Sequence, residues 1–209
     1  MATPLTHAFF ALAGGKAAIH RKAPMQFWVL MAICAAVPDI DVLWRRLVAN
    51  PMGIWAHRGI AHSLLAAAVF GLLAACVCRA GKQPPNIPDA APGRRRPART
   101  FLLLWLVFAL ATASHAMLDM LSTGYRGVML LAPFDDHRYA FGWQPIWSMP
   151  QWVGQTLRRL APHGGRGSWL AMAFLSEIIV VWAPMTVLLI VSRLVRQAHR
   201  KERATVLED

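Results

Sequence analysis

The sequence predicts an all-α protein, a multi-pass transmembrane helical bundle with four or five membrane segments that forms a single membrane domain over residues 1–209. Two observations predict this fold class. Of the 209 residues, 56% are hydrophobic and only 15% are charged, whereas a soluble domain carries about 25% charged residues. The apolar residues also fall in long runs, as a bilayer requires, because a spanning helix needs roughly 20 apolar residues.

Five apolar runs are candidates for these membrane segments. The three strongest are Met25–Trp44, Ile60–Cys78 and Phe101–Leu121. A fourth run, Ser168–Ser192, contains Glu177 and Pro184, so we expect it to kink or tilt. The run Leu5–Ile19 is short, and we expect it either to span the membrane or to re-enter it. It does not resemble a signal peptide, because its basic residues follow it instead of preceding it.

The basic residues beside these runs predict the orientation of the chain. They are concentrated in the turn after the first run, in the Pro- and Arg-rich linker 79–100 and in the tail 193–209. Placing these segments in the cytoplasm puts the N-terminus, the connection 45–59 and the loop 122–167 on the outer side. In that loop, Ser148, Pro150 and Gln151 form a capping pattern that predicts a helix lying in the headgroup plane.

The net charge of +12 raises the question of nucleic-acid binding. The Lys and Arg residues lie beside apolar runs, as membrane orientation demands, and no basic helix carries interleaved readout residues. We therefore expect membrane lipids, and no nucleic acid, as partners. The cysteines lack the spacing of a zinc knuckle or a disulfide framework and are expected to be small apolar side chains; they are Cys34, Cys76 and Cys78.

Ionisable residues at the ends of the apolar runs indicate where the chemistry lies, because such residues are costly in a membrane and are usually functional. They form four groups along the chain: His7; Asp39 and Asp41; His57, Arg58 and His62; and His115 with Asp119. In the predicted topology every group reaches the outer end of its helix. Basic residues elsewhere set that orientation, so the convergence is an independent indication of one shared site.

Each group has a simpler interpretation when it is taken alone. His115 and Asp119 are four residues apart and share a helical face, so they could form a structural hydrogen bond. Asp39 and Asp41 could be polar caps, although Pro38 allows a helix break that turns both inward. These separate interpretations do not explain why four polar groups collect at one face of the membrane. We therefore predict a metal site whose ligands are His7, Asp39, Asp41, His57, His62, His115 and Asp119.

This mixture of imidazole and carboxylate groups suits a divalent metal, with zinc as the first candidate and manganese or iron where oxygen donors dominate. The number of potential ligands allows one or two ions. Asp39 or Asp41 could instead act as a general base. Arg58 could clamp a phosphate with its planar guanidinium, or it could anchor a headgroup or cap the loop.

The same residues, in this order, resemble a known family. They are His7, Pro38-Asp39-Ile40-Asp41, His57-Arg58-Gly59-Ile60-Ala61-His62-Ser63 and Ser114-His115 followed by Asp119, with Thr123, Gly124 and Pro133 beyond them. Over roughly residues 1–135 this pattern resembles the YdjM-like, LexA-regulated inner-membrane proteins, a family of membrane-bound metal-dependent hydrolases. The resemblance implies a bacterial inner-membrane protein, and in the orientation predicted from the basic residues its site faces the periplasm.

A more distant resemblance concerns the order of the metal ligands. The zinc-dependent phospholipases C and the P1-type nucleases use the order His, Asp, His and then His-x-x-x-Asp, which matches His7, Asp41 or Asp39, His62, His115 and Asp119. Their later His-x-x-x-Glu pattern is missing here. Glu177, or His137 beside Asp135 and Asp136, could replace it, although those three loop residues are more simply a polar loop. One or two ions are therefore expected instead of three.

The sequence thus predicts a metal-dependent hydrolase of a phosphoester, with lipids among the candidate substrates. A divalent-metal transporter is the main alternative, but transport sites lie near the midplane and commonly between repeats, and no repeat is visible. A non-catalytic scaffold held together by its polar cluster is the third hypothesis. A serine hydrolase is disfavoured, because Ser63 and Ser114 lack a nucleophile-elbow context.

Overall fold

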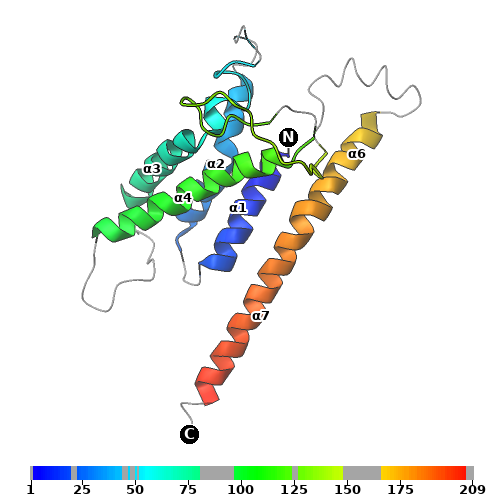
Figure 1. Cartoon of the computed structure of the whole chain (residues 1–209). Helices are drawn as coiled ribbons and strands as arrows, with labels where there is room; N and C mark the ends of the chain where they lie inside the picture. Colours follow the sequence, from blue (N-terminus) through cyan, green and yellow to red (C-terminus); the bar gives the residue numbers. More distant parts are fainter. Residues whose placement is uncertain are drawn as a thin grey trace.

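The computed structural model describes residues 2–19, 23–43, 47, 50, 52–80, 97–123, 127–147 and 166–205. Within these residues the chain is helical, and extended backbone pairs only at two isolated bridges, Ser122 with Ile146 and Val128 with Tyr139. The all-α fold class predicted from the sequence is confirmed. Figure 1 shows a bundle of helices beside one long C-terminal rod.

Four helices form the bundle: α1 (Pro4–Ala18), α2 (Met25–Ala36), α3 (Leu64–Ala80) and α4 (Pro97–Met120). Thr3 caps α1, because its hydroxyl accepts a hydrogen bond from the Thr6 amide, and Pro4 begins the helix. The regular helix α2 ends before Pro38, where a break was predicted, and continues as the 3-10 helix η1 (Val37–Leu43). A short 3-10 turn, η3 (Ile60–His62), precedes α3.

The C-terminal rod consists of α6 (Arg166–Glu177), one π-helical segment η4 (Ile178–Trp182) and α7 (Ala183–Thr205). The π-helical segment lies between Glu177 and Pro184, the two residues that predicted an irregularity in this run. A proline cannot donate to the preceding turn, so the hydrogen-bond pattern there must adjust. Figure 1 shows the rod running alongside α1 and extending past the other helices.

Among the residues that the structure describes, three helical segments are long and apolar enough to cross a membrane: Met25–Leu43, Ala98–Met120 and Ala171–His199. The apolar helix Leu64–Ala80 is shorter. The outward-facing side chains of these helices are mostly Leu, Val and Ile, as a lipid-facing surface requires. The chain is therefore a membrane protein, and four or five membrane segments agree roughly with these helices.

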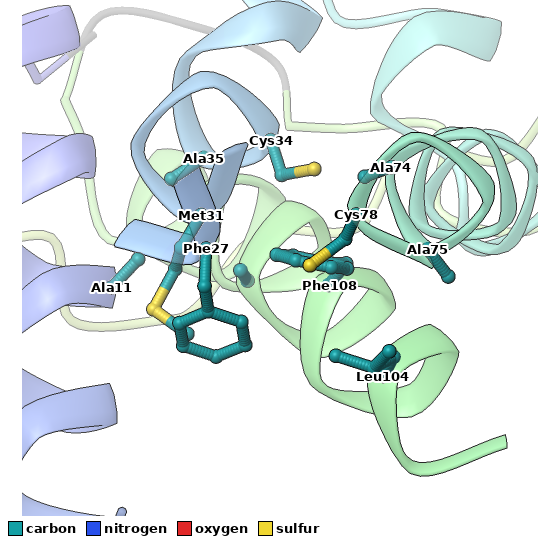
Figure 2. Packing of buried hydrophobic residues seen from close by; sticks show 11 residues of the cluster. Ala11, Phe27, Met31, Cys34, Ala35, Ala74, Ala75, Cys78, Leu104 and Phe108 are labelled. Atoms are coloured by element: carbon teal, nitrogen blue, oxygen red, sulfur yellow. The ribbon is translucent and has the colours of Figure 1, made fainter. Parts of the chain in front are cut away.

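The main core lies where α2, α3 and α4 meet, with α1 against one side (Figure 2). Phe27, Met31 and Phe108 are the large side chains at its centre, and each is at most 2% exposed. Cys34 and Cys78 are buried among them, as predicted for small apolar side chains, whereas Cys76 is exposed. The core therefore holds the ends of α2 and α4 together, and those ends carry the candidate site residues.

Helices α3 and α4 approach each other closely because Gly71 has no side chain. A Cβ atom at Gly71 would lie 2.7 Å from the Cα atom of Ala109, closer than real Cβ atoms approach backbone. The indole of Trp105 also donates a hydrogen bond to the Ala68 carbonyl across this contact, at 2.8 Å. Small residues at such crossings allow close packing in membranes, where no hydrophobic effect drives helices together.

Glu177 joins the C-terminal rod to the start of α1. Its carboxylate accepts hydrogen bonds from the Thr3 amide at 2.7 Å, from the Thr3 hydroxyl at 2.8 Å and from the Thr6 hydroxyl. The Trp182 indole also donates to the Thr6 hydroxyl, at 2.8 Å. A carboxylate at a helix N-terminus is favourable because it meets the positive end of the helix dipole. These contacts set the position of α1, and His7 follows directly on Thr6.

We expect Gly71→Leu to destabilise the protein by about 1–3 kcal/mol, because the new side chain must push the α4 backbone away. The matched control is Cys76→Leu, which adds a similar side chain at an exposed position of the same helix. Thermal unfolding of both variants in detergent checks this. Equal unfolding midpoints for Gly71→Leu and the wild type would contradict the close α3–α4 contact.

Candidate metal centre

The candidate site residues of the four sequence groups lie at one end of the bundle. The start of α1, the end of α2 with η1, the start of α3 and the end of α4 all reach this end, and the segment after α4 lies across it (Figure 1). The side chains that converge here are largely buried: His7, His115 and Asp119 are fully inaccessible, and Asp41 is 1% and His62 is 2% exposed.

A tight turn between η1 and α3 carries the third group of site residues, which are His57, Arg58 and His62. Arg58 has a positive φ of 64°, a conformation that few non-glycine residues adopt. At Gly59 a Cβ atom would collide with the backbone carbonyls of Ile54 and Ala56, so only glycine fits. The turn places His57 and His62 on either side of the Asp41 carboxylate.

Four side chains present donor atoms to one point: Asp39, His62, His115 and Asp119. One ligand atom from each of them lies within 4.8 Å of all the others. The Nε2 atoms of His62 and His115 are 3.1 Å apart. From His62 Nε2, Asp119 Oδ2 is at 3.4 Å and Asp39 Oδ1 at 3.8 Å. From His115 Nε2, the same two oxygens are at 3.9 Å and 3.4 Å.

These separations fit a bound metal ion better than a set of paired hydrogen bonds. Tetrahedral zinc with ligand bonds of about 2.0–2.1 Å has its ligand atoms about 3.3 Å apart. Hydrogen bonds to nitrogen are shorter, mostly near 2.9 Å. Within the described residues, neither carboxylate oxygen of Asp39 has a hydrogen-bond partner, although both are buried. Buried polar atoms without partners are rare, and an ion between them is one explanation.

The hydrogen bonds around His115 leave its Nε2 atom available as a ligand. Its Nδ1 atom lies 2.7 Å from the Ala35 carbonyl oxygen. A carbonyl can only accept, so Nδ1 carries the proton, and in the neutral ring Nε2 has a lone pair facing the other donors. Histidine ligands in metalloproteins are commonly oriented by such a second hydrogen bond. The end of α2 therefore holds the ring of α4 in a ligating orientation.

Asp41 is placed beside the histidines and not at the meeting point of the four donors. One of its oxygens lies 2.6 Å from His57 Nδ1, and the other lies 3.2 Å from His62 Nδ1 and accepts from the Arg58 amide at 3.1 Å. Carboxylates in this position orient ligating imidazoles and raise their basicity. Asp41, His57 and His62 could also surround a second ion, but His62 would then have to serve both ions.

The guanidinium of Arg58 lies inside the cluster. Its Nε atom is 2.9 Å from Asp119 Oδ2, and both side chains are fully buried. Arg58 therefore holds a carboxylate of the cluster, a role not among the three that the sequence suggested for it. The buried carboxylates of Asp39, Asp41 and Asp119 outnumber this single guanidinium. The cluster has a formal charge of −2 when its imidazoles are neutral, which a divalent cation would balance.

His7 lies at the edge of the cluster. Its ring stacks on the His115 ring with centroids 3.7 Å apart, and its Nε2 atom is 3.7 Å from Asp119 Oδ1. Neither of its ring nitrogens has a hydrogen-bond partner within the described residues. His7 thus faces the carboxylate oxygen of Asp119 that points away from His62.

The downstream residues that the sequence offered as replacements for missing ligands lie elsewhere. Glu177 binds the start of α1. Asp135 belongs to a polar loop, since its oxygens accept from the His137 amide and the Tyr139 hydroxyl at 2.9 Å each. The helix predicted from Ser148, Pro150 and Gln151 lies outside the described residues. Nothing in the sequence pattern indicated the Ala35 carbonyl or the Thr3 and Thr6 contacts of Glu177.

Comparison with known proteins extends the resemblance beyond residue 135. The model of the YdjM inner membrane protein family matches residues 1–199. The inner membrane protein YbcI of Escherichia coli (strain K12) is 29% identical over 184 residues, which cover 88% of this chain and 92% of YbcI. No solved structure matches the chain. With its long apolar helices, the chain is an inner membrane protein, and it belongs to the YdjM family.

Proposed function

We propose that this protein is a membrane-bound, metal-dependent hydrolase that cleaves a phosphoester and holds one divalent cation with Asp39, His62, His115 and Asp119. The convergence of these four donors within 4.8 Å supports the proposal most strongly. Two imidazoles and two carboxylates are a donor set that suits zinc, and manganese or iron would require more oxygen donors. If its coordination shell keeps one position open beside these four ligands, such a cation would supply a nucleophilic water at neutral pH and would polarise the phosphoryl oxygens.

The surrounding residues then have distinct roles in the proposed reaction. Asp41 orients His57 and His62, and with His57 it forms a carboxylate–imidazole pair that can accept the proton lost by the attacking water. Arg58 holds Asp119 in place through its Nε atom. Its permanent charge also stabilises negative charge that develops on the phosphoryl oxygens as the ester bond breaks.

The position of the cluster favours hydrolysis over metal transport. The four groups lie at the ends of their helices and under the segment 127–139, whose Met129 amide donates to the Arg58 carbonyl at 2.9 Å. Transport sites lie near the membrane midplane, between helices that rock about them. At the headgroup level phosphates are the commonest hydrolysable groups, so a phosphoester, with lipids among the candidates, is the proposed substrate.

The proposed orientation places this end of the bundle in the periplasm. The end of α3 and the start of α4, which flank the basic linker, lie at the opposite end of the molecule from the cluster, and so do the basic last turns of α7 (Figure 1). Cytoplasmic flanks carry an excess of Lys and Arg, because positive segments are retained on that side. A periplasmic site would act on substrates in the outer leaflet or in the periplasm.

His62→Ala and His115→Ala should each remove bound metal while the protein still inserts and elutes as a folded species. Loss of a ligand from a preformed site mainly lowers metal affinity. Asp41→Asn should weaken metal binding by about 10–100-fold without abolishing it, as expected for an orienting carboxylate. Metal content of the detergent-purified variants, measured by elemental analysis, checks both expectations.

The matched control for this measurement is His137→Ala, which removes an exposed histidine from the polar loop. Its metal content should equal that of the wild type. If His62→Ala and His115→Ala kept full metal content, the cation would have to bind elsewhere. If the wild type held no metal and both variants failed to fold, the polar cluster would instead be a structural scaffold.

The purified protein should hydrolyse a phosphoester, lose this activity on chelation and regain it when the metal is restored. Arg58→Lys should lower the rate by about a hundredfold, because lysine keeps the charge but loses the planar fork that meets Asp119 and the phosphoryl oxygens. Phospholipids, isoprenoid phosphates and soluble phosphodiesters are the substrates to compare. Metal-replete protein that cleaves none of them but moves zinc across liposomes would be a transporter.

The proposed orientation predicts the accessibility of single cysteines introduced into a chain that lacks Cys34, Cys76 and Cys78. Asn50→Cys, in the connection before α3, should react with an impermeant thiol reagent from the periplasm. Ala80→Cys, at the other end of α3, should react only after the inner membrane is opened. The reverse pattern would place the metal site in the cytoplasm.

A further inference from the structure

We propose that Arg138 is the residue that recognises the substrate, by binding the phosphoryl group at the rim of the metal centre. This inference rests on the proposed function and identifies a residue that the sequence motifs did not single out. Arg138 lies in the segment that crosses the end of the bundle, where the backbones of Val128 and Tyr139 pair in both directions at 2.8 and 2.9 Å.

The guanidinium of Arg138 lies next to the turn that carries the cluster. Its Nη1 atom is 3.5 Å from the Arg58 carbonyl oxygen and 3.3 Å from the Gly127 carbonyl oxygen. Its Nη2 atom is 3.5 Å from the Met52 carbonyl oxygen. All three contacts lie beyond the usual range of 2.7–3.2 Å for such hydrogen bonds. They hold the side chain against the turn without using its full capacity to donate.

Arg138 has no acidic partner within the part of the chain that the structure describes. The nearby carboxylate of Asp135 is held by the His137 amide and the Tyr139 hydroxyl. The Nε atom of Arg138 is buried and donates to no described group. A half-buried guanidinium usually has a carboxylate or phosphate partner, because desolvating a charge without one is costly. A ligand anion would supply that partner.

The charges of the metal centre also favour an anion beside Arg138. With a divalent cation bound, the three carboxylates and Arg58 leave the buried cluster neutral, so Arg138 adds a positive charge at its rim. Burial and the charge of Arg58 both lower the pKa of Arg138, since each of them disfavours its cationic form. An anion beside Arg58 and Arg138 would offset both the burial of the Arg138 charge and its repulsion from Arg58. An electropositive rim also concentrates anionic substrates at the site.

A phosphoryl group is the anion that best fits this arrangement. A guanidinium presents paired N–H donors that match two phosphate oxygens, and pairs of this type are stronger than neutral hydrogen bonds. The same chemistry is offered by a phospholipid headgroup and by a soluble phosphate ester. In the proposed reaction Arg138 would bind one phosphoryl oxygen pair while the metal centre receives another oxygen.

Binding of inorganic phosphate to the detergent-purified full chain tests this role without relying on turnover. Isothermal titration compares the wild type with Arg138→Gln, Arg138→Lys and the control Arg193→Gln, which removes an exposed arginine of α7. Each protein is titrated with and without added zinc, and its metal content is measured in parallel. We expect Arg138→Gln to weaken phosphate binding at least tenfold, Arg138→Lys to weaken it less, and Arg193→Gln to leave it unchanged.

Unchanged affinity in Arg138→Gln, or no phosphate binding by the wild type, would overturn the role of Arg138. If Arg138→Gln does not fold, equal affinity of Arg138→Lys and the wild type would overturn it as well. A wild type without metal, whose phosphate binding still depends on Arg138, would reject the metal centre while supporting the anion site. Displacement by glycerol 3-phosphate or by short-chain phosphatidic acid supports the role, and the stronger competitor identifies a soluble or a lipid source.

Discussion

The buried carboxylate of Asp119 is the group on which the rest of the site depends. It comes from α4 and meets Arg58 at 2.9 Å, His62 at 3.4 Å and His7 of α1 at 3.7 Å. A charge buried at this depth costs several kcal/mol unless other groups compensate it. Here the compensation comes from two other segments of the chain, α1 and the turn before α3. The positions of α1, of the turn before α3 and of α4 are therefore coupled through one side chain.

Close packing of the bundle away from the site holds these compensating groups in place. Gly71 lets α3 and α4 cross at short distance, and Phe27 and Phe108 fill the space between α2 and α4. The rod formed by α6 and α7 contributes from outside the cluster, because Glu177 fixes the start of α1 and so the position of His7. Apolar packing thus sets the positions of α2, α3 and α4, and the polar contacts of Glu177 set the position of α1.

Much of the site could be predicted because helical periodicity and basic flanks place polar residues at known helix ends. That reasoning brought His7, Asp39, His62, His115 and Asp119 to one end of the bundle, where the structure has them. It could not assign the different roles of Asp39 and Asp41, since these depend on the 3-10 path after Pro38. The position of Arg138 could not be predicted for a similar reason. Its segment has no periodicity, and only the folded chain brings it to Arg58.

The central claim is that Asp39, His62, His115 and Asp119 surround one divalent cation. X-ray absorption at the metal edge of the zinc-loaded protein tests it most directly, because it reports ligand type, number and distance at the ion itself. We predict two imidazole nitrogens and two carboxylate oxygens as protein ligands at about 2.0–2.1 Å, and we expect His115→Ala to lose this shell together with the bound metal. A shell of oxygen ligands alone, or one unchanged by His115→Ala, would contradict the claim.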